Sequence, residues 1–279
     1  MRLLILSALL AGCLPPAEGL RATPPGAGPQ VVIDWDARPF AEIPFPNDLA
    51  TVPDPDSPTG LRINLSEQAS TEVERRARRR LNTLSGFGIF SPISVRLSHR
   101  LDLDAVKSHH EWGMRPQDGA VLLIDVDPDS PAFGSFIDLD MGHGRFPQDV
   151  VQTDRYFPND PHATSPSLLF SGVDEDLNGD GILDPAEDTD GDGVLDTPNV
   201  WPIGGDPRAD MLTWYELETD TLIVRPVVPL RETTRYAVVL TNKVVDQGQQ
   251  PVRSPWDAVN HLRQTQALEP IDFLARNEV

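Results

Sequence analysis

The chain has 279 residues, of which 39% are hydrophobic and 6% aromatic, a length and composition that suit one or two domains with a modest core. Its 28 prolines argue against long helices and favour turns and extended segments. The formal net charge of −20 excludes nucleic acid as a natural partner, because phosphate binding needs basic surfaces. Calcium and basic surfaces are the partners that such an acidic chain favours.

The N-terminus has the pattern of a secretory signal. Arg2 precedes an apolar run, residues 3–11, that is too short to span a membrane. The segment LLAGC at 9–13, where this run ends, is similar to the lipobox of bacterial lipoproteins, which implies that residues 1–12 are removed and that Cys13 is lipidated. An ordinary signal peptide with an incidental cysteine is the alternative. Cys13 is the single cysteine, so no internal disulfide can form.

The residues after the cysteine bear on localisation. Leu14, the residue after the cysteine, resembles the signal that directs Gram-negative lipoproteins to the outer membrane. We therefore expect a protein of the cell envelope, held in the lipid bilayer of the outer membrane through Cys13. Residues 13–30 are rich in proline, glycine and alanine, and we expect them to form an unfolded tether.

The first elements of the folded part are a short strand at 31–35, a proline-punctuated loop and one helix. The sequence predicts this helix over 66–86, with Ser66 as the N-cap and Gly86 as the stop. It contains the single basic run of the chain, RRARRR at 75–80. A solvated helix face that pairs with acidic groups is the plainer interpretation, and binding to lipid or a polyanion is the alternative.

Strand patterns dominate the rest of the chain, separated by turn residues. Short strands at this spacing predict a mainly β fold, an antiparallel β-sandwich over 31–255. The C-terminal segment 256–279 is predicted to be helical, with a serine cap and a proline at the first helical position just before it. The predicted strands lie at 91–98, 119–127, 211–217, 221–227 and 235–246.

An acidic, glycine-rich stretch, DLNGDGILDPAEDTDGDGVLD at 176–196, carries the most specific motif. Its first half matches the calcium loop D-x-[DN]-x-[DN]-G-x5-E, in which side-chain and carbonyl oxygens surround one point. Calcium takes about six to eight oxygens, whereas zinc prefers nitrogen and sulfur. The predicted ligands of this first loop are Asp176, Asn178, Asp180, Ile182, Asp184 and Glu187.

The calcium pattern repeats immediately in a second loop. Asn199 stands where a glutamate normally closes such a loop, so the second match is weaker or borrows a ligand from its neighbour. The predicted ligands of the second loop are Asp188, Asp190, Asp192, Val194, Asp196 and Asn199.

Prolines on both sides of the two loops exclude the flanking helices of an EF-hand. The stretch resembles instead the back-to-back calcium loops of thrombospondin type 3 repeats and dockerin-like segments. This resemblance implies a structural Ca²⁺ insert at 174–199, and a calcium sensor is not expected because no helix pair is available to open. A disordered acidic loop is the alternative.

Three further pieces together resemble the N-terminal domain of the bacterial virulence factor lipases. They are IPFPNDL at 43–49, LNTLSGFGIFSPISVRLS at 81–98 and LIVRPVVPLRETTRYAVVLTNKVVDQGQQPV at 222–252. The resemblance covers most of 31–255 outside the calcium insert. It implies an immunoglobulin-like sandwich placed before an α/β-hydrolase domain.

The sequence departs from that family in its chemistry. No serine lies on a G-x-S-x-G elbow, and the six histidines form no H-E-x-x-H pattern. We therefore expect no catalytic residue. The leading hypothesis is a non-enzymatic, surface-anchored lipoprotein whose insert presents a surface to an unknown protein or extracellular ligand. The alternative is the N-terminal module of a secreted lipase or esterase whose hydrolase domain is missing or encoded separately.

Overall fold

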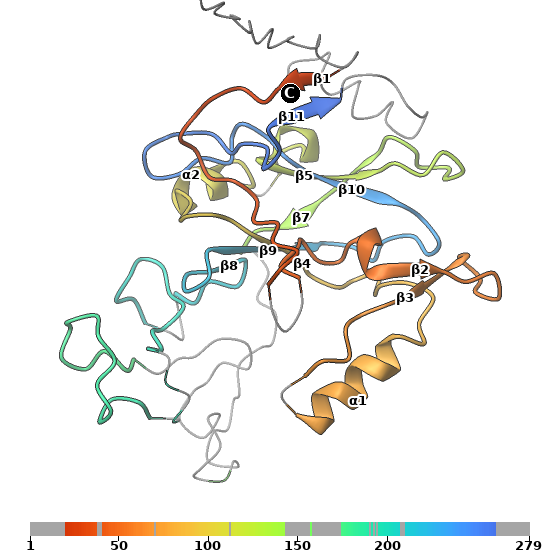
Figure 1. Ribbon diagram of the computed structural model, residues 1–279. Coiled ribbons are helices and arrows are strands. Elements are labelled where there is room, and N and C mark those ends of the chain that lie inside the picture. Colours follow the sequence, from red (N-terminus) through yellow and green to blue (C-terminus); the bar gives the residue numbers. More distant parts are fainter. Residues whose placement is uncertain are drawn as a thin grey trace, which may run out of the picture.

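The computed structural model describes residues 20–37, 41–69, 71–111, 113–142, 157, 174–189, 191, 193, 195–206 and 210–260. Over these residues the fold is mainly β, built of antiparallel sheets with two α-helices and two short 3-10 helices (Figure 1). The strands are β1 (Leu20–Ala22), β2 (Thr51–Pro53), β3 (Leu61–Ile63), β4 (Ile93–Arg96), β5 (Val121–Asp125), β6 (Phe136–Ile137), β7 (Leu139–Asp140), β8 (Tyr215–Glu216), β9 (Thr221–Pro226), β10 (Tyr236–Leu240) and β11 (Ala258–Asn260). The helices are α1 (Glu72–Leu81), α2 (Leu103–Ser108), η1 (Asp48–Ala50) and η2 (Pro116–Asp118).

Two sheets enclose the main core. One has the order β10-β5-β6, and the other has the order β4-β9-β7 with β8 also paired to β9. All five residues of β5 are buried, because its two faces pack against different groups of side chains. Val121 and Leu123 join the main core, while Leu122 and Ile124 form a second cluster with Phe136. This explains why residues 121–124 of β5 form a continuous apolar run rather than an alternating one.

Tyr215 of β8 is the largest fully buried side chain in the described part of the chain. Its hydroxyl accepts a hydrogen bond from the Leu101 amide at 3.3 Å and donates one to Asp220 at 3.1 Å. Burial raises the pKa of Tyr215, so the phenol stays protonated and keeps donating. The bond to Asp220 fixes the turn between β8 and β9.

The predicted strands are confirmed over shorter spans, except for 31–35, which makes isolated bridges to Leu97 and Glu42. The helix predicted over 66–86 is confirmed only over α1, because Thr71 rather than Ser66 accepts the capping bond from the Glu74 amide. Helix α2 was not predicted.

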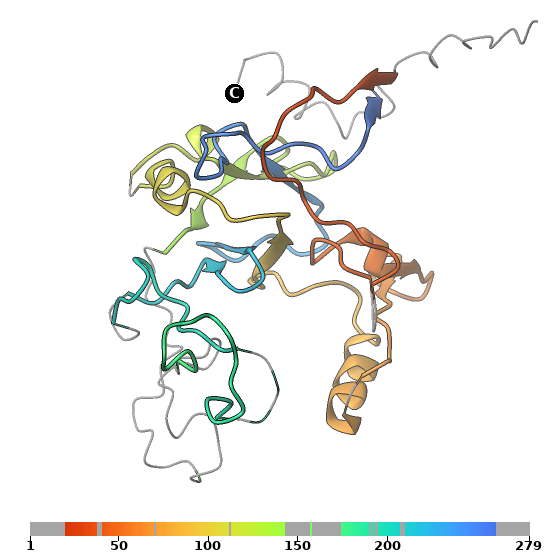
Figure 2. The ribbon, with the colours of Figure 1, turned by 60° about the vertical axis from the view of Figure 1, so that its left-hand side comes forward.

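Helix α1 stands apart from the sheets and buries none of its residues (Figure 2). Its arginines pair mostly with glutamates of the same helix, such as Arg75 with Glu72 at 2.6 Å and Arg78 with Glu74 at 2.7 Å. The solvated basic face expected from the sequence is therefore confirmed. No helix among the described residues has the length and apolar character needed to cross a membrane.

Two domain assignments need correction at the ends of the described chain. The tether predicted at 13–30 is not unfolded throughout, since β1 pairs with β11 and the Gln30 amide bonds to the Ser98 hydroxyl. The helix predicted from residue 256 is wrong for 256–260. Pairing with β1 satisfies that backbone instead, because a tertiary contact outweighs the local helix signal. Residues 1–19, including Cys13, and 261–279 lie outside the described residues.

A turn after β10 supplies a pH-dependent contact. The Asp246 carboxylate accepts hydrogen bonds from the Gln250 amide at 2.9 Å and from His99 at 3.1 Å. The Gln250 bond is the main reason that the pKa of Asp246 lies below its usual value. The stability that this carboxylate contributes is therefore present above its unfolded pKa of about 4 and is lost as the pH falls through the lower folded value.

We expect Asp246→Asn to lower the free energy of unfolding by about 1.5–3 kcal/mol near neutral pH, because it removes a hydrogen-bonded charge. The variant should also lose less stability than the wild type on acidification below about pH 4. Urea midpoints measured across the acid range test both points. Asp129→Asn, in an exposed turn, is the control and should match the wild type. Parallel curves for wild type and Asp246→Asn would contradict the assignment.

Candidate metal centre

The insert predicted to bind calcium, residues 174–199, lies at the end of the molecule away from β1 and β11, beside the lower edge of the sheets in Figures 1 and 2. Its described residues are 174–189, 191, 193 and 195–199. Four glycines in it, at 179, 181, 191 and 193, have positive φ values between 72° and 78°. This left-handed conformation is strained for other residues, so the glycines allow the chain to turn tightly around each loop.

In the first loop, the side chains at positions 1, 3 and 5 turn toward the backbone of the same loop. The amide of Gly181 donates to Asp176 Oδ2 at 3.0 Å, and the amide of Asp180 donates to Asn178 Oδ1 at 2.8 Å. Asp180 Oδ1 in turn accepts from the Ile182 amide at 2.9 Å. These bonds use one oxygen of each side chain to shape the turn and gather the acidic groups within one small loop.

Glu187 closes the first loop from position 12. It is 6% exposed, and its two carboxylate oxygens accept hydrogen bonds from the amides of Asn178 at 3.1 Å and Asp184 at 3.3 Å. Glu187, predicted as the ligand at position 12, therefore contacts the start of its loop through the Asn178 amide. Its bonds hold the two ends of the loop together.

Among the residues that the structure describes, one buried oxygen of the first loop has no hydrogen-bond partner. Asp176 Oδ1 is buried and accepts no hydrogen bond, although Oδ2 of the same carboxylate is bonded. A buried carboxylate oxygen without a donor is costly unless a cation neutralises it. The oxygen donors of the first loop are of the kind that Ca²⁺ takes, and an ion beside Asp176 Oδ1 would satisfy this oxygen at the position where the motif places the first ligand, although no three acidic side chains of the described residues converge on one point.

The second loop repeats part of this pattern. Asp188 accepts from the amides of Gly191 at 2.7 Å and Gly193 at 3.2 Å, which gives it the same contact between positions 1 and 6 as in the first loop. The predicted ligands Asp190, Asp192 and Val194 lie outside the described residues. Over the described part of the chain, no three histidine, cysteine or acidic side chains converge in the way a metal ion held by such groups alone would need.

Glu175 joins the two loops, a role that the sequence did not reveal. It is fully buried, its Oε1 accepts from the amide and hydroxyl of Thr189 at 2.6 and 2.7 Å, and its Oε2 accepts from the Asp196 amide at 3.1 Å. These bonds connect the start of the first loop to Thr189 near the start of the second loop and to Asp196 in its later half. In a chain with 43 acidic residues, one more glutamate before the motif gives no sequence signal.

Asn199 was predicted to be the last ligand of the second loop, and the structure shows its side chain in contact with the segment around β8. Its amide nitrogen donates to the carbonyls of Leu212 at 2.9 Å and Tyr215 at 2.8 Å, and its oxygen accepts from the Leu217 amide at 2.8 Å. The side chain is 5% exposed. It anchors the end of the insert to the segment around β8, because the backbone there needs these partners.

Three of the six histidines, at 143, 162 and 261, lie outside the described residues. His99 lies on the surface between Ser98 and Asp246, and it contributes to the turn described above. His110 Nε2 accepts from the amides of Ala120 and Val121, both at 3.1 Å. These contacts hold loops and strand ends in place.

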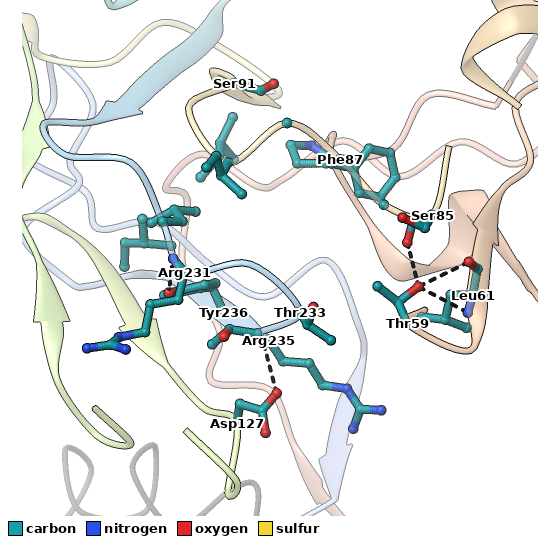
Figure 3. Close-up of a pocket in the computed structure, with 18 of the residues that line it drawn as sticks. Thr59, Leu61, Ser85, Phe87, Ser91, Asp127, Arg231, Thr233, Arg235 and Tyr236 are labelled. Atoms are coloured by element: carbon teal, nitrogen blue, oxygen red, sulfur yellow. Dashed lines mark hydrogen bonds between the residues drawn. The ribbon is translucent and has the colours of Figure 1, made fainter. Parts of the chain in front are cut away.

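A separate cavity of about 380 Å³ lies between the β3 side of the molecule and the loop before β10 (Figure 3). The three sequence pieces that resemble the lipase family meet there: Pro46 comes from the first, 85–93 from the second and 230–236 from the third. Arg231 and Arg235 lie on its rim in Figure 3, and two aspartates, 127 and 129, also line it. Opposite charges balance on this rim, so it favours no ligand charge.

Comparisons with family models, curated proteins and solved structures find no match to this chain.

Proposed function

We propose that this chain is a calcium-stabilised β module of a lipid-anchored envelope protein, with Ca²⁺ in the first loop of the insert. The buried, unpartnered Asp176 Oδ1 within a motif of calcium-loop spacing is the observation that carries the proposal. Asp176, Asn178, Asp180, Asp184 and Glu187, with the Ile182 carbonyl, would hold the ion. Bound calcium supplies positive charge that offsets the clustered carboxylates, so that its binding energy orders the loop.

The insert then has a mechanical role in the proposal. When the first loop is ordered, the hydrogen bonds of Glu175 would order the second loop as well. The hydrogen bonds of Asn199 would in turn hold the end of the insert against the β8 segment. The ordered insert would present its outer surface to a protein or extracellular ligand. Its place away from β1 supports this, since residues 1–19 and the proposed lipid anchor at Cys13 precede β1.

Titration calorimetry of the full chain with Ca²⁺ tests the metal site. We expect a dissociation constant on the order of 10⁻⁴–10⁻³ M, as in weak extracellular calcium modules. Asp176→Ala should abolish binding to the first loop, because it removes the buried oxygen that has no hydrogen-bond partner among the described residues. Asp129→Ala, an acidic turn residue outside the insert, is the control and should bind calcium like the wild type.

Amide exchange gives a second readout of the same proposal. Chelation should increase exchange across 176–189 while β5 and β9 stay protected, since the sheets have their own core. Absence of binding at millimolar calcium, together with unchanged exchange after chelation, would leave the insert as an acidic loop and end the proposal.

We also propose that the sheets form an immunoglobulin-like sandwich of the kind found in the virulence factor lipases. The meeting of the three resembling pieces at one cavity supports this, because pieces distant in sequence share one place in the fold (Figure 3). The rival function, an N-terminal module of a secreted lipase, rests on the same observation. An in-frame or frameshifted G-x-S-x-G in the DNA after residue 279 would favour that rival.

A further inference from the structure

A second cavity, distinct from the metal centre and from the cavity of Figure 3, has the composition of a small-molecule site. It has a volume of about 480 Å³ and lies between the loop after α2 and the β6–β7 segment. Ligand pockets in proteins commonly occupy about 300–1,000 Å³ and are mostly apolar with a few polar groups. The apolar part of this lining includes Phe90, Met114, Ile137, Leu139 and Val227.

Three of the apolar side chains that line the cavity are also exposed to solvent. Phe90, Met114 and Val227 are 43%, 37% and 42% exposed, although they lie together around one cavity. An aromatic ring and a thioether are polarisable surfaces, and a ring face attracts cations electrostatically. Such a lining therefore suits a ligand with an apolar body.

Among the described residues, the charged groups that line the cavity without forming a hydrogen bond or an ion pair are carboxylates. Within the described part of the chain, no hydrogen bond or ion pair engages the carboxylates of Glu111 and Asp138. Arg115, the one arginine in the lining, forms a 2.7 Å ion pair with Asp118. Asp140 also lines the cavity, and its charge acts on the buried guanidinium of Arg225.

The neighbouring basic groups do not reverse this sign. Burial, and to a lesser extent the charge of Lys243, keeps the pKa of His109 below its usual value, so this imidazole is neutral near pH 7. Lys243 itself donates to the Asp118 carbonyl at 2.9 Å. The net charge of −20 on the chain adds a long-range attraction for cations.

We propose that this cavity binds an organic cation with an apolar body, such as an arylalkyl amine. The ammonium group lies toward Glu111 and Asp138, and the apolar body packs against Phe90 and Met114. Neutral and anionic compounds of the same shape bind more weakly, since they leave the two carboxylates without a counter-charge.

Three probes of matched shape test the charge preference: 4-phenylbutylamine, 4-phenylbutanol and 4-phenylbutyrate. The chain has four methionines, so a spectrum of ¹³C-methyl-methionine-labelled full chain is simple, and Met114→Leu identifies the signal of the cavity. We expect the amine to shift the Met114 signal with a dissociation constant on the order of 10⁻³ M. The alcohol should bind about tenfold more weakly, the carboxylate more weakly still, and the signal of Met211, which does not line the cavity, should not move.

The double variant Glu111→Gln/Asp138→Asn removes both free charges without a change in shape. It should bind the amine about tenfold more weakly and the alcohol as the wild type does. Asp127→Asn/Asp129→Asn, in the other cavity, is the matched control and should leave amine binding unchanged. Equal binding of amine and alcohol by the wild type, preference for the carboxylate, or an amine affinity that survives in the double variant would overturn the proposal.

Discussion

Asn199→Ala should lower the free energy of unfolding by about 3–5 kcal/mol, because it leaves three buried backbone groups without partners. These are the carbonyls of Leu212 and Tyr215 and the amide of Leu217, which the Asn199 side chain now serves. Leu212, Tyr215 and Leu217 belong to the main core, so the loss affects global unfolding. Urea denaturation followed by circular dichroism measures it.

Two matched variants separate the hydrogen bonds from side-chain size. Asn199→Asp keeps the shape but replaces the donor that faces two carbonyls, so it should be destabilised about as strongly as the alanine variant. Asn178→Ala, at an exposed position in the first loop, should unfold globally like the wild type. A loss below about 1 kcal/mol for Asn199→Ala would show that water replaces the side chain and that the anchor is unimportant.

Glu175→Gln is expected to weaken calcium binding by about 10–100-fold, the usual cost of losing a group that orients metal ligands without contacting the metal. Glutamine has the same shape, but its amide nitrogen cannot accept from the Thr189 or Asp196 amides, so one side of the junction between the loops is lost. The amides of Thr189 and Asp196 should exchange faster at the same time.

Calorimetry and amide exchange on the same samples make this prediction decisive. Glu232→Gln, an exposed glutamate in the loop before β10, is the control and should behave as the wild type. If Glu175→Gln binds calcium normally while exchange at Thr189 increases, the two loops are linked structurally but bind calcium independently. The proposed transfer of order between the loops would then be wrong.

The sequence predicted those elements whose patterns are local. The turn between β8 and β9 and the apolar run of β5 depend on nearby residues, and both are confirmed. The end of the chain could not be predicted in this way. Residues 258–260 form β11 because β1 lies beside them, and this contact joins positions more than 200 residues apart. A serine and a proline before a mixed segment favour a helix only while no such partner is present.

For the candidate metal site, too, the sequence predicted the local pattern but not the contacts with distant residues. The spacing of acidic residues placed Asp176, Asp180 and Glu187 in one loop, and their backbone bonds follow that spacing. It could not distinguish Asn199 as an anchor, because an asparagine at the closing position has the same chemistry in either role. Nor could it single out Glu175, whose importance comes from burial.

Pairing of β1 with β11 also has a consequence for the order in which the strands pair during folding. Leu20 faces Asn260 and Ala22 faces Ala258, so these strands can meet only after all the residues between them have been synthesised. A chain made from its N-terminus carries β1 unpaired until that point, while contacts of shorter range are already possible. Closure of so long a loop is among the slower steps of folding, so β1 and β11 should pair last.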